Sequence, residues 1–330
     1  MRILPAIVLL AVCSAAAIAG CGGRHDGIYL RLGHDQPTGH PYDLAALRFA
    51  RGVEEASAGR IRVAVYSASQ LGDSPEQIEG LHLGTLDLAL AAFSHASQFC
   101  TELGLFGAPF LFEGERHFAA VFDGPIGDDL DRACGRRYAV RLLATLTSGD
   151  RVLFNGRRAV ERSADLAGLK VRVMGGEADA LTWQAFGAIP VPMPYSEVYS
   201  ALQAGVIDGA ENEPVSIVTN RFYEAARHIA PTGHLVLPMG MFISERRLER
   251  LSDADRALVR QQARLAAEWQ RALMAERNRA ALTEMQERYG VAVSRVDAAE
   301  LREKARPVQE RVADRLQLHE LLAKVRAAGG

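Results

Sequence analysis

The chain has 330 residues, and 48% of them are hydrophobic. Its 38 Lys and Arg residues nearly balance 40 Asp and Glu residues, which leaves a net charge of −2. Because no basic run or stripe of basic and aromatic residues breaks this balance, nucleic acids and anionic membrane surfaces are poor candidates for partners, and a small acid is a better one. After removal of an N-terminal signal, about 300 residues remain, which favours two lobes over one compact core.

The N-terminal segment predicts export. A short positive end, Met1 and Arg2, precedes an almost wholly apolar stretch at residues 3–19, as in a secretory signal. Residues 18–21 resemble the lipobox of bacterial lipoproteins, with Ile18 where Leu is commoner, so we expect residues 1–21 to be a lipoprotein signal peptide with lipidation on Cys21. A plain signal peptide or an uncleaved anchor remains an alternative, because about 20 apolar residues can span a bilayer.

Strand-like and helix-like segments then alternate, which predicts an α/β fold. The expected strands are residues 28–33, 61–66, 86–91, 139–146 and 169–173, and the expected helices are 44–56, 75–83, 177–186 and 196–203. Gly84, Gly187 and Gly205 end three of these helices, as a left-handed cap requires. The repeated pattern predicts two similarly built lobes.

One helical segment is much longer than the others. Ser252 and Asp255 form a plausible capping box, and the helical pattern continues to about Arg288. The large apolar residues on one of its faces are Leu258, Leu265, Trp269 and Leu273. At about 1.5 Å per residue this helix would measure roughly 50 Å, so we expect it to run across both lobes.

The cysteines suggest a disulfide and no metal. Cys13 would be lost with the signal, and apart from Cys21 the mature chain has only Cys100 and Cys134. Neither has a second Cys or a His at the spacing of a zinc site. In an oxidising compartment the two can form a disulfide, but a sequence does not give their separation, and two buried thiols are the alternative.

Arg172 is the strongest candidate for a ligand contact. It lies in the alternating run of residues 169–173, where it can face a cleft while Val171 and Val173 are buried. Its planar guanidinium offers a fork of donors that matches a carboxylate.

Several segments carry a resemblance to a known family. In order and spacing, residues 66–72, 79–80, 83–87, 108–112, 168–173, 194–199 and 208–212 resemble the DctP family, the periplasmic solute receptors of tripartite ATP-independent (TRAP) transporters. The resemblance covers nearly all of the mature chain. It implies a two-lobed periplasmic binding protein fold of α/β class, type II-like, with a long helix spanning both lobes.

We place the lobe boundaries from this pattern. The first lobe is expected to hold residues 28–148 plus about 236–275, and the second residues 149–235 plus about 276–330. The ligand cleft would lie between them.

The resemblance also assigns roles in the second lobe. Arg172 corresponds to the arginine that grips the ligand carboxylate, Asn212 to the asparagine beside it, Arg151 to a second arginine, and Tyr195 to an aromatic residue against the ligand body. Structural alternatives remain open for each: an interlobe salt bridge for Arg172, a hinge brace for Arg151, a satisfied turn for Asn212, and ordinary core for Tyr195.

Candidates in the first lobe are His34, Asp35, Gln70 and His95, any of which could instead be structural or solvated. Glu213 departs from the family pattern, because related receptors often have Asn or Pro there. A carboxylate at this position would repel an acid, so we expect it to point away or to pair with an arginine.

The resemblance implies capture of an organic acid and no chemistry. The lobes would close on the ligand, and the closed form would deliver it to the membrane permease subunits, with no cofactor. An enzyme is disfavoured because no nucleophile elbow, Gly-rich phosphate loop or paired His motif is present. A sensor that presents its ligand to a membrane kinase would share the same site.

The ligand class remains open at this stage. Residues 33–36 and 210–212, together with His40, lean slightly toward a sugar acid such as a uronate or aldonate. A C4-dicarboxylate follows closely, because Arg151 could hold a second carboxylate as easily as a hydroxyl. A 2-oxo or aromatic monoacid is the remaining candidate.

Overall fold

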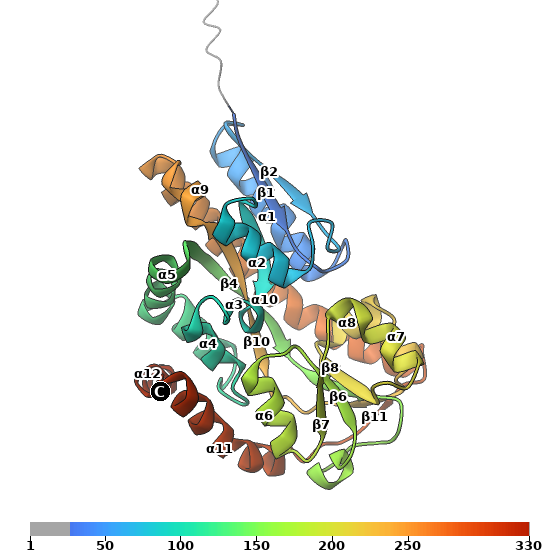
Figure 1. Ribbon diagram of the computed structural model, residues 1–330. Coiled ribbons are helices and arrows are strands. Elements are labelled where there is room, and N and C mark those ends of the chain that lie inside the picture. The colour runs from blue at the N-terminus through green and yellow to red at the C-terminus, as the bar shows by residue number, and fades with distance from the viewer. Residues whose placement is uncertain (1–26, 330) are drawn as a thin grey trace, which may run out of the picture.

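The computed structural model describes residues 27–329. The predicted signal peptide and the lipidation site Cys21 lie outside these residues. The described chain forms two mixed sheets with helices packed around them (Figure 1). The first sheet has the strand order β2-β1-β3-β10-β4, and the second has the order β11-β9-β5-β8-β6-β7. The predicted two-lobed α/β class is confirmed.

The first sheet and its helices come mainly from the N-terminal half. Its strands are β1 (Ile28–Gly33), β2 (Ile61–Tyr66), β3 (Leu88–Ala92), β4 (Val140–Asp150) and β10 (Val236–Ser244). β1 pairs in parallel with β2 and β3, whereas β10 runs antiparallel to β3 and β4. The accompanying helices are α1 (Pro41–Ala56), α2 (Ser74–Leu83), α3 (Phe93–Ala96), η1 (Thr101–Gly107), α4 (Glu115–Phe122), α5 (Pro125–Tyr138) and α9 (Glu245–Glu249).

The second sheet follows along the chain. Its strands are β5 (Val152–Asn155), β6 (Lys170–Val173), β7 (Ile189–Pro192), β8 (Gly209–Asn212), β9 (His228–Ala230) and β11 (Ala292–Val293). Its helices are η2 (Ser163–Leu166), α6 (Glu177–Ala185), η3 (Tyr195–Glu197), α7 (Val198–Gln203), α8 (Pro214–Thr219) and η4 (Phe222–Glu224). Two further helices, α11 (Ala298–Leu316) and α12 (His319–Ala327), end the described chain.

Three connections link the sheets: the β4–β5 junction at Arg151, the β9–β10 segment, and helix α10 (Asp253–Glu287). The predicted lobe boundaries stay a prediction. Leu322 and Val325 of α12 pack in the same core cluster as Phe118 and Phe122, so the C-terminal segment also contacts the helices around the first sheet.

Most predicted elements are present, with local differences. The helix expected at 44–56 begins at Pro41, because His40 caps it: its Nδ1 accepts a hydrogen bond from the Tyr42 backbone N–H at 3.2 Å. The strand expected at 139–146 continues to Asp150, because its pairing with β10 continues to Val236.

Helix α10 is present as predicted, but none of Leu258, Leu265, Trp269 and Leu273 is fully buried; Val259, Met274 and Met285 are. Ser252 caps it through the Asp255 backbone N–H at 3.2 Å. Leu265 is 45% exposed, whereas Ala263, Ala266 and Ala267 are buried. Small side chains allow the helix to lie close to its neighbours α1 and β4.

Polar side chains then fasten α10 to β4. Gln270 exchanges two hydrogen bonds with the Thr147 backbone, at 3.1 and 2.9 Å, and Asn278 Nδ2 donates to the Ser148 carbonyl at 2.8 Å. Arg271 donates to the Thr145 carbonyl. The buried face of α10 therefore combines Val259, Met274 and small alanines with these polar side chains.

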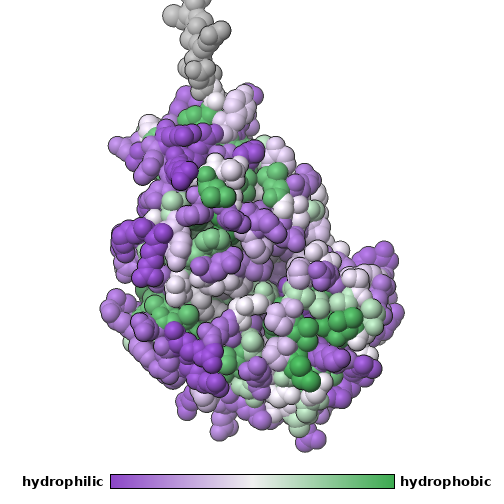
Figure 2. Space-filling view, viewed as in Figure 1, coloured by the Kyte–Doolittle hydropathy of each residue, from purple (hydrophilic) through white to green (hydrophobic). Residues whose placement is uncertain are grey.

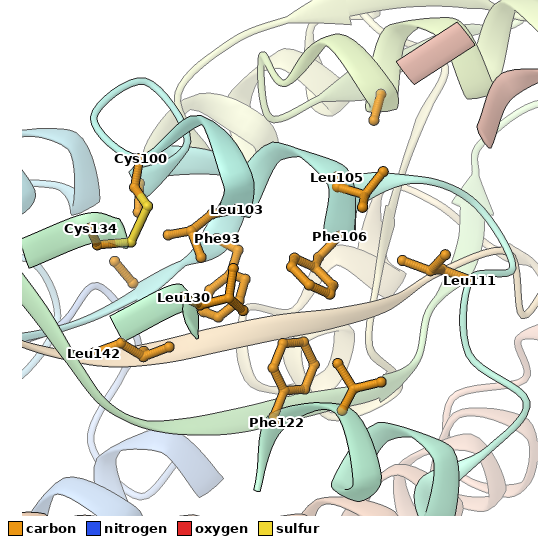
Figure 3. Close-up of a cluster of buried hydrophobic side chains, with 14 of the residues drawn as sticks. Phe93, Cys100, Leu103, Leu105, Phe106, Leu111, Phe122, Leu130, Cys134 and Leu142 are labelled. Atoms are coloured by element: carbon orange, nitrogen blue, oxygen red, sulfur yellow. A yellow bond between two sulfur atoms is a disulfide. The ribbon is translucent and has the colours of Figure 1, made fainter. Parts of the chain in front are cut away.

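Cys100 and Cys134 form a disulfide with a Cα–Cα distance of 5.1 Å. It joins the start of η1 to α5, and Figure 3 shows it at one end of the hydrophobic cluster that contains Leu103, Leu130 and Phe93. Of the two alternatives left open by the sequence, the structure contains the bond.

The face shown in Figure 2 is mostly hydrophilic, with smaller hydrophobic areas between the polar ones. In residues 27–329, no helix combines the length and apolar character needed to cross a bilayer.

Candidate functional site

A small cavity of about 40 Å³ lies between the two sheets. Its wall comes from both of them: the β1–α1 loop, α1, α3 and β10 on one side, and β6, β8 and η3 on the other. The lining residues are Asp35, Gln36, Tyr42, Ala92, His95, Arg151, Arg172, Met174, Tyr195, Asn212, Glu213, Leu237 and Met239. Six of the eight residues predicted from the sequence to contact the ligand lie in this wall: Arg151, Arg172, Tyr195, Asn212, Asp35 and His95.

Larger hollows exist elsewhere, but their chemistry suits an anion less well. Two hollows of about 490 and 500 Å³ share Gly114, Asp150, Gly233 and Val236 in their walls. In the first, Arg271 is paired with Asp123 and Arg279 is exposed to solvent; in the second, Arg302 lies over the Phe110 ring. The small cavity between the sheets is therefore the candidate site.

Arg172 enters the cavity from β6 as a buried cation without a counter-ion. It is 2% exposed, and its Nε donates to the Met193 carbonyl at 3.0 Å. Within residues 27–329, Nη1 and Nη2 of Arg172 donate no hydrogen bond, and the guanidinium forms no ion pair. The guanidinium carbon lies 5.7 Å from the centre of the Tyr195 ring. Burial lowers the pKa of Arg172 below its ordinary value; the charge of Glu211 opposes this shift, and the charge of Arg151 adds to it. A bound anion would offset the free-energy cost of burying this positive charge.

Arg151 has the opposite environment. Its Nε and Nη2 donate to the Glu211 carboxylate, Nη2 also donates to the Glu211 carbonyl at 3.0 Å, and Nη1 donates to Glu213 Oε2 at 2.7 Å. Burial opposes the charge of Arg151, but Glu211 and Glu213 outweigh it and hold the pKa of Arg151 above its ordinary value. The expectation that Glu213 points away or pairs with an arginine is confirmed by this contact.

Asn212 and Tyr195 are joined by a hydrogen bond. Asn212 Nδ2 donates to the Tyr195 hydroxyl at 3.0 Å, and Asn220 Nδ2 donates to the same oxygen at 3.0 Å. Asn212 Oδ1 accepts from the Glu213 backbone N–H at 3.0 Å. These bonds fix the Tyr195 ring against the Arg172 guanidinium, so both residues lie in the wall with defined orientations.

Three uncharged side chains bring unsatisfied polar atoms to the cavity wall. In the described part of the chain, Gln36 Oε1, the Tyr42 hydroxyl and His95 Nδ1 are buried and lack a hydrogen-bond partner. Burial lowers the pKa of His95, so its imidazole is neutral near pH 7. Buried polar atoms are nearly always satisfied, which makes these three natural partners for a polar ligand.

The predicted first-lobe residues divide into two groups. Asp35 and His95 line the cavity. His34 does not: its Nε2 lies 3.2 Å from Asp43 Oδ1, beneath the wall. Gln70 is exposed and also lies outside the wall.

Sequence reasoning missed several wall residues. Tyr42 lies inside a helix whose apolar face explains it equally well, and Leu237 and Met239 lie in a continuous buried strand. Gln36 follows the predicted contact Asp35, and Met174 follows the strand that carries Arg172, but neither was itself predicted to contact the ligand. Glu213 gave a signal, as a charged residue beside Asn212.

Metal binding has no support from side-chain grouping. Within residues 27–329, no group of three or more His, Cys, Asp or Glu side chains could hold a metal ion.

Asp179 is a second buried group near the arginines. Its Oδ2 is buried without a partner, and burial, followed by the charge of Glu211, raises its pKa from 3.8 to about 7. The folded protein therefore retains this proton between pH 4 and 7 while the unfolded chain has lost it, so this group makes stability fall as pH rises through that window.

We expect Asp179→Asn to remove this pH dependence. At pH 8 the variant should exceed the wild type in free energy of unfolding by a few kcal/mol, with an upper value on the order of 4 kcal/mol at about 1.36 kcal/mol per pKa unit. The difference should vanish near pH 4. Urea unfolding at pH 4, 6 and 8 measures it, and equal differences at all three pH values would contradict the assignment.

Comparisons with known proteins agree with this architecture. Residues 32–315 match the family described as bacterial extracellular solute-binding protein, family 7. The 2,3-diketo-L-gulonate-binding periplasmic protein of Escherichia coli is 30% identical over 248 residues, which make up 75% of this chain and 75% of that protein.

Two solved structures are also similar. A TRAP periplasmic solute binding protein from Chromohalobacter salexigens with bound D-glucuronate is 32% identical, with a TM-score of 0.86 over 91% of this chain and 99% of that chain. One from a Polaromonas species bound to D-erythronate is 30% identical, with a TM-score of 0.86 over 91% and 98%. This chain therefore belongs to the bacterial extracellular solute-binding protein family 7, the DctP family of TRAP solute receptors.

Proposed function

We propose that this protein is the receptor for a hydroxylated monocarboxylic acid, such as a uronate or an aldonate. The observation that carries the proposal is Arg172, whose buried guanidinium directs unpaired Nη donors into the cavity. A ligand carboxylate can accept from both of these nitrogens, and each charge-assisted hydrogen bond contributes about 1.5–3 kcal/mol.

The rest of the wall suits hydroxyl groups and carbon. Gln36, Tyr42 and His95 present unsatisfied polar atoms that are uncharged, which favours hydroxyls over further ionic groups. Ala92, Met174, Leu237 and Met239 supply an apolar surface for the carbon skeleton. The ligands of the relatives, D-glucuronate, D-erythronate and 2,3-diketo-L-gulonate, are all monocarboxylates that carry hydroxyl groups.

The partner follows from family membership. We infer that the closed, ligand-bound form delivers its acid to the membrane subunits of a TRAP transporter, and that the protein acts by capture and not by catalysis. Lipidation of Cys21 would keep the receptor beside that permease at the periplasmic face of the membrane.

A thermal-shift screen tests the proposal. The protein from residue 22 onward would be heated with a panel of uronates, aldonates, C4-dicarboxylates and 2-oxo acids. A ligand at 100 times its dissociation constant adds about 2.7 kcal/mol, which for a chain of this size raises the melting temperature by a few degrees. Shifts with uronates or aldonates support the proposal, and shifts confined to other acids or absent throughout contradict it.

A further inference from the structure

We propose that His40 and Ser216 hold the cleft of this receptor closed over its ligand, through a hydrogen bond that forms across the cleft only in the closed form. His40 Nε2 lies 3.0 Å from Ser216 Oγ, and the two residues are buried, at 1% and 0% exposure. Neither residue is part of the cavity wall. The proposal rests on the capture mechanism of the proposed function, and it holds whichever acid is captured.

The cavity has to open before an acid can enter. Tyr42, Arg172 and Glu213 lie in its wall and are each 2% exposed. Elements of both sheets build the wall, so entry requires the elements around the first sheet to move away from those around the second. A contact between the two sides of the cleft is therefore broken in the open form and made again on closure.

His40 and Ser216 lie on opposite sides of the cleft. His40 caps α1, which packs against β2 of the first sheet. Ser216 lies in α8, whose Ile217 packs in a core cluster with Val152 and Phe154 of the second sheet. Figure 1 shows α1 beside the first sheet and α8 beside the second. Opening of the cleft therefore separates His40 from Ser216.

The hydrogen bonds around His40 give this contact a defined direction. His40 Nδ1 accepts from the Tyr42 backbone N–H at 3.2 Å, so Nδ1 carries no proton. Burial lowers the pKa of His40 to about 3, and the charge of His34 adds to this shift, so the ring is neutral with its proton on Nε2. His40 Nε2 therefore donates to Ser216 Oγ.

The Ser216 hydroxyl is already oriented on its own side of the cleft. It donates to Glu213 Oε1 at 2.7 Å, while Glu213 Oε2 accepts from Arg151 Nη1 at 2.7 Å. Burial raises the pKa of Glu213, and Arg151 and Ser216 oppose that shift. Because its own hydrogen is used in this way, Ser216 Oγ offers a lone pair to the His40 N–H when the cleft closes.

Two contacts elsewhere in the cleft are weaker. Ser196 Oγ and Asp73 Oδ2 are 3.4 Å apart in an exposed position, and Ser94 Oγ donates to the Met174 sulfur, a weak acceptor, at 3.6 Å. Water can replace an exposed hydrogen bond, whereas a buried donor that loses its acceptor keeps its full desolvation cost. Of these three contacts, the one between His40 and Ser216 therefore has the largest expected effect on closure.

Two substitutions remove this hydrogen bond, one from each side of the cleft. His40→Asn keeps the cap of α1, because Asn is a favoured N-cap residue, but its side chain is too short to reach Ser216. Ser216→Ala removes the acceptor. It also removes the bond to Glu213, but that bond lies within one side of the cleft, so its loss affects the open and closed forms alike.

The probe is D-glucuronate or D-erythronate or, if neither raises the melting temperature, the acid of the screening panel that does. At pH 7.5 each variant should bind this acid about tenfold more weakly than the wild type, mainly through faster dissociation. Isothermal titration measures the affinity, and stopped-flow fluorescence measures the dissociation rate. Ser196→Ala is the matched control, because it removes the exposed contact across the same cleft, and it should change the affinity by less than about threefold.

The double variant distinguishes one shared hydrogen bond from two separate defects. If His40 and Ser216 act through the same bond, the double variant should bind within about threefold of either single variant, and not about a hundredfold more weakly than the wild type. In urea unfolding of the unliganded protein, the effects of the two substitutions should add, because the open form lacks the bond.

Each outcome decides the matter. Wild-type affinity in either single variant overturns the proposal, and so do additive losses of ligand affinity. Coupling of the two substitutions in unfolding of the unliganded protein also overturns it, because the bond would then be a permanent contact. The proposed function survives all three results. A wild type that binds only dicarboxylates or 2-oxo acids overturns the sugar-acid function and leaves the His40–Ser216 test intact, whereas a wild type that binds no acid of the panel overturns both.

Discussion

Arg172→Met is expected to weaken binding of the acid by about 10²- to 10⁴-fold, which corresponds to the loss of two charge-assisted hydrogen bonds at about 1.5–3 kcal/mol each. The Nη atoms of Arg172 meet no acceptor in the described chain, so they are the donors that the ligand carboxylate can use. Isothermal titration with the acid selected by the thermal-shift screen measures the change. The affinity of Arg172→Lys should lie between those of the wild type and Arg172→Met, because lysine keeps a charge but loses the planar fork of donors.

The same variant should not lower the stability of the unliganded protein. Burial lowers the pKa of Arg172, so its charge costs free energy in the folded state, and Met removes that cost while filling a similar volume. We expect an equal or higher free energy of unfolding in urea. If Arg172 instead formed a structural salt bridge, Arg172→Met would lose much of its stability and show little change in ligand affinity.

Arg151→Met is expected to destabilise the fold by about 3–5 kcal/mol, because it leaves the buried carboxylates of Glu211 and Glu213 without their cation. Burial opposes the charge of Glu211, but Arg151 and then His234 outweigh it and hold the pKa of Glu211 far below its ordinary value. Urea unfolding at pH 7 measures the loss, and Arg172→Met is the matched control. If the two variants were equally stable, the pairing described for Arg151 would be wrong.

Much of the fold could be predicted from the sequence, because its signals are local. Strands β1 and β2 lie at the predicted residues, and β6 begins only one residue later than predicted, since alternation of side chains directly reflects burial of one face. The cap at Ser252 and the length of α10 were also readable, because capping and helical periodicity need no tertiary contact.

The features that could not be predicted depend on tertiary contacts. The buried face of α10 is set by Gln270, Arg271 and Asn278, which satisfy backbone groups of β4, and nothing in the sequence shows which strand lies beneath them. Arg151 and Arg172 look alike in the sequence. Both arginines lie beside β8, because β5 and β6 pair with its two edges, but the Glu211 and Glu213 side chains bind Arg151 and leave Arg172 without an ion pair in the described chain.

The central claim is that the ligand carboxylate lies on Arg172 and not on Arg151. A crystal structure of the protein with the acid that gives the largest thermal shift tests it most directly. We predict both carboxylate oxygens within about 3.2 Å of Arg172 Nη1 and Nη2, with Arg151 still bound to Glu211 and Glu213. A carboxylate bound by Arg151, with a glutamate displaced from it, would contradict the account.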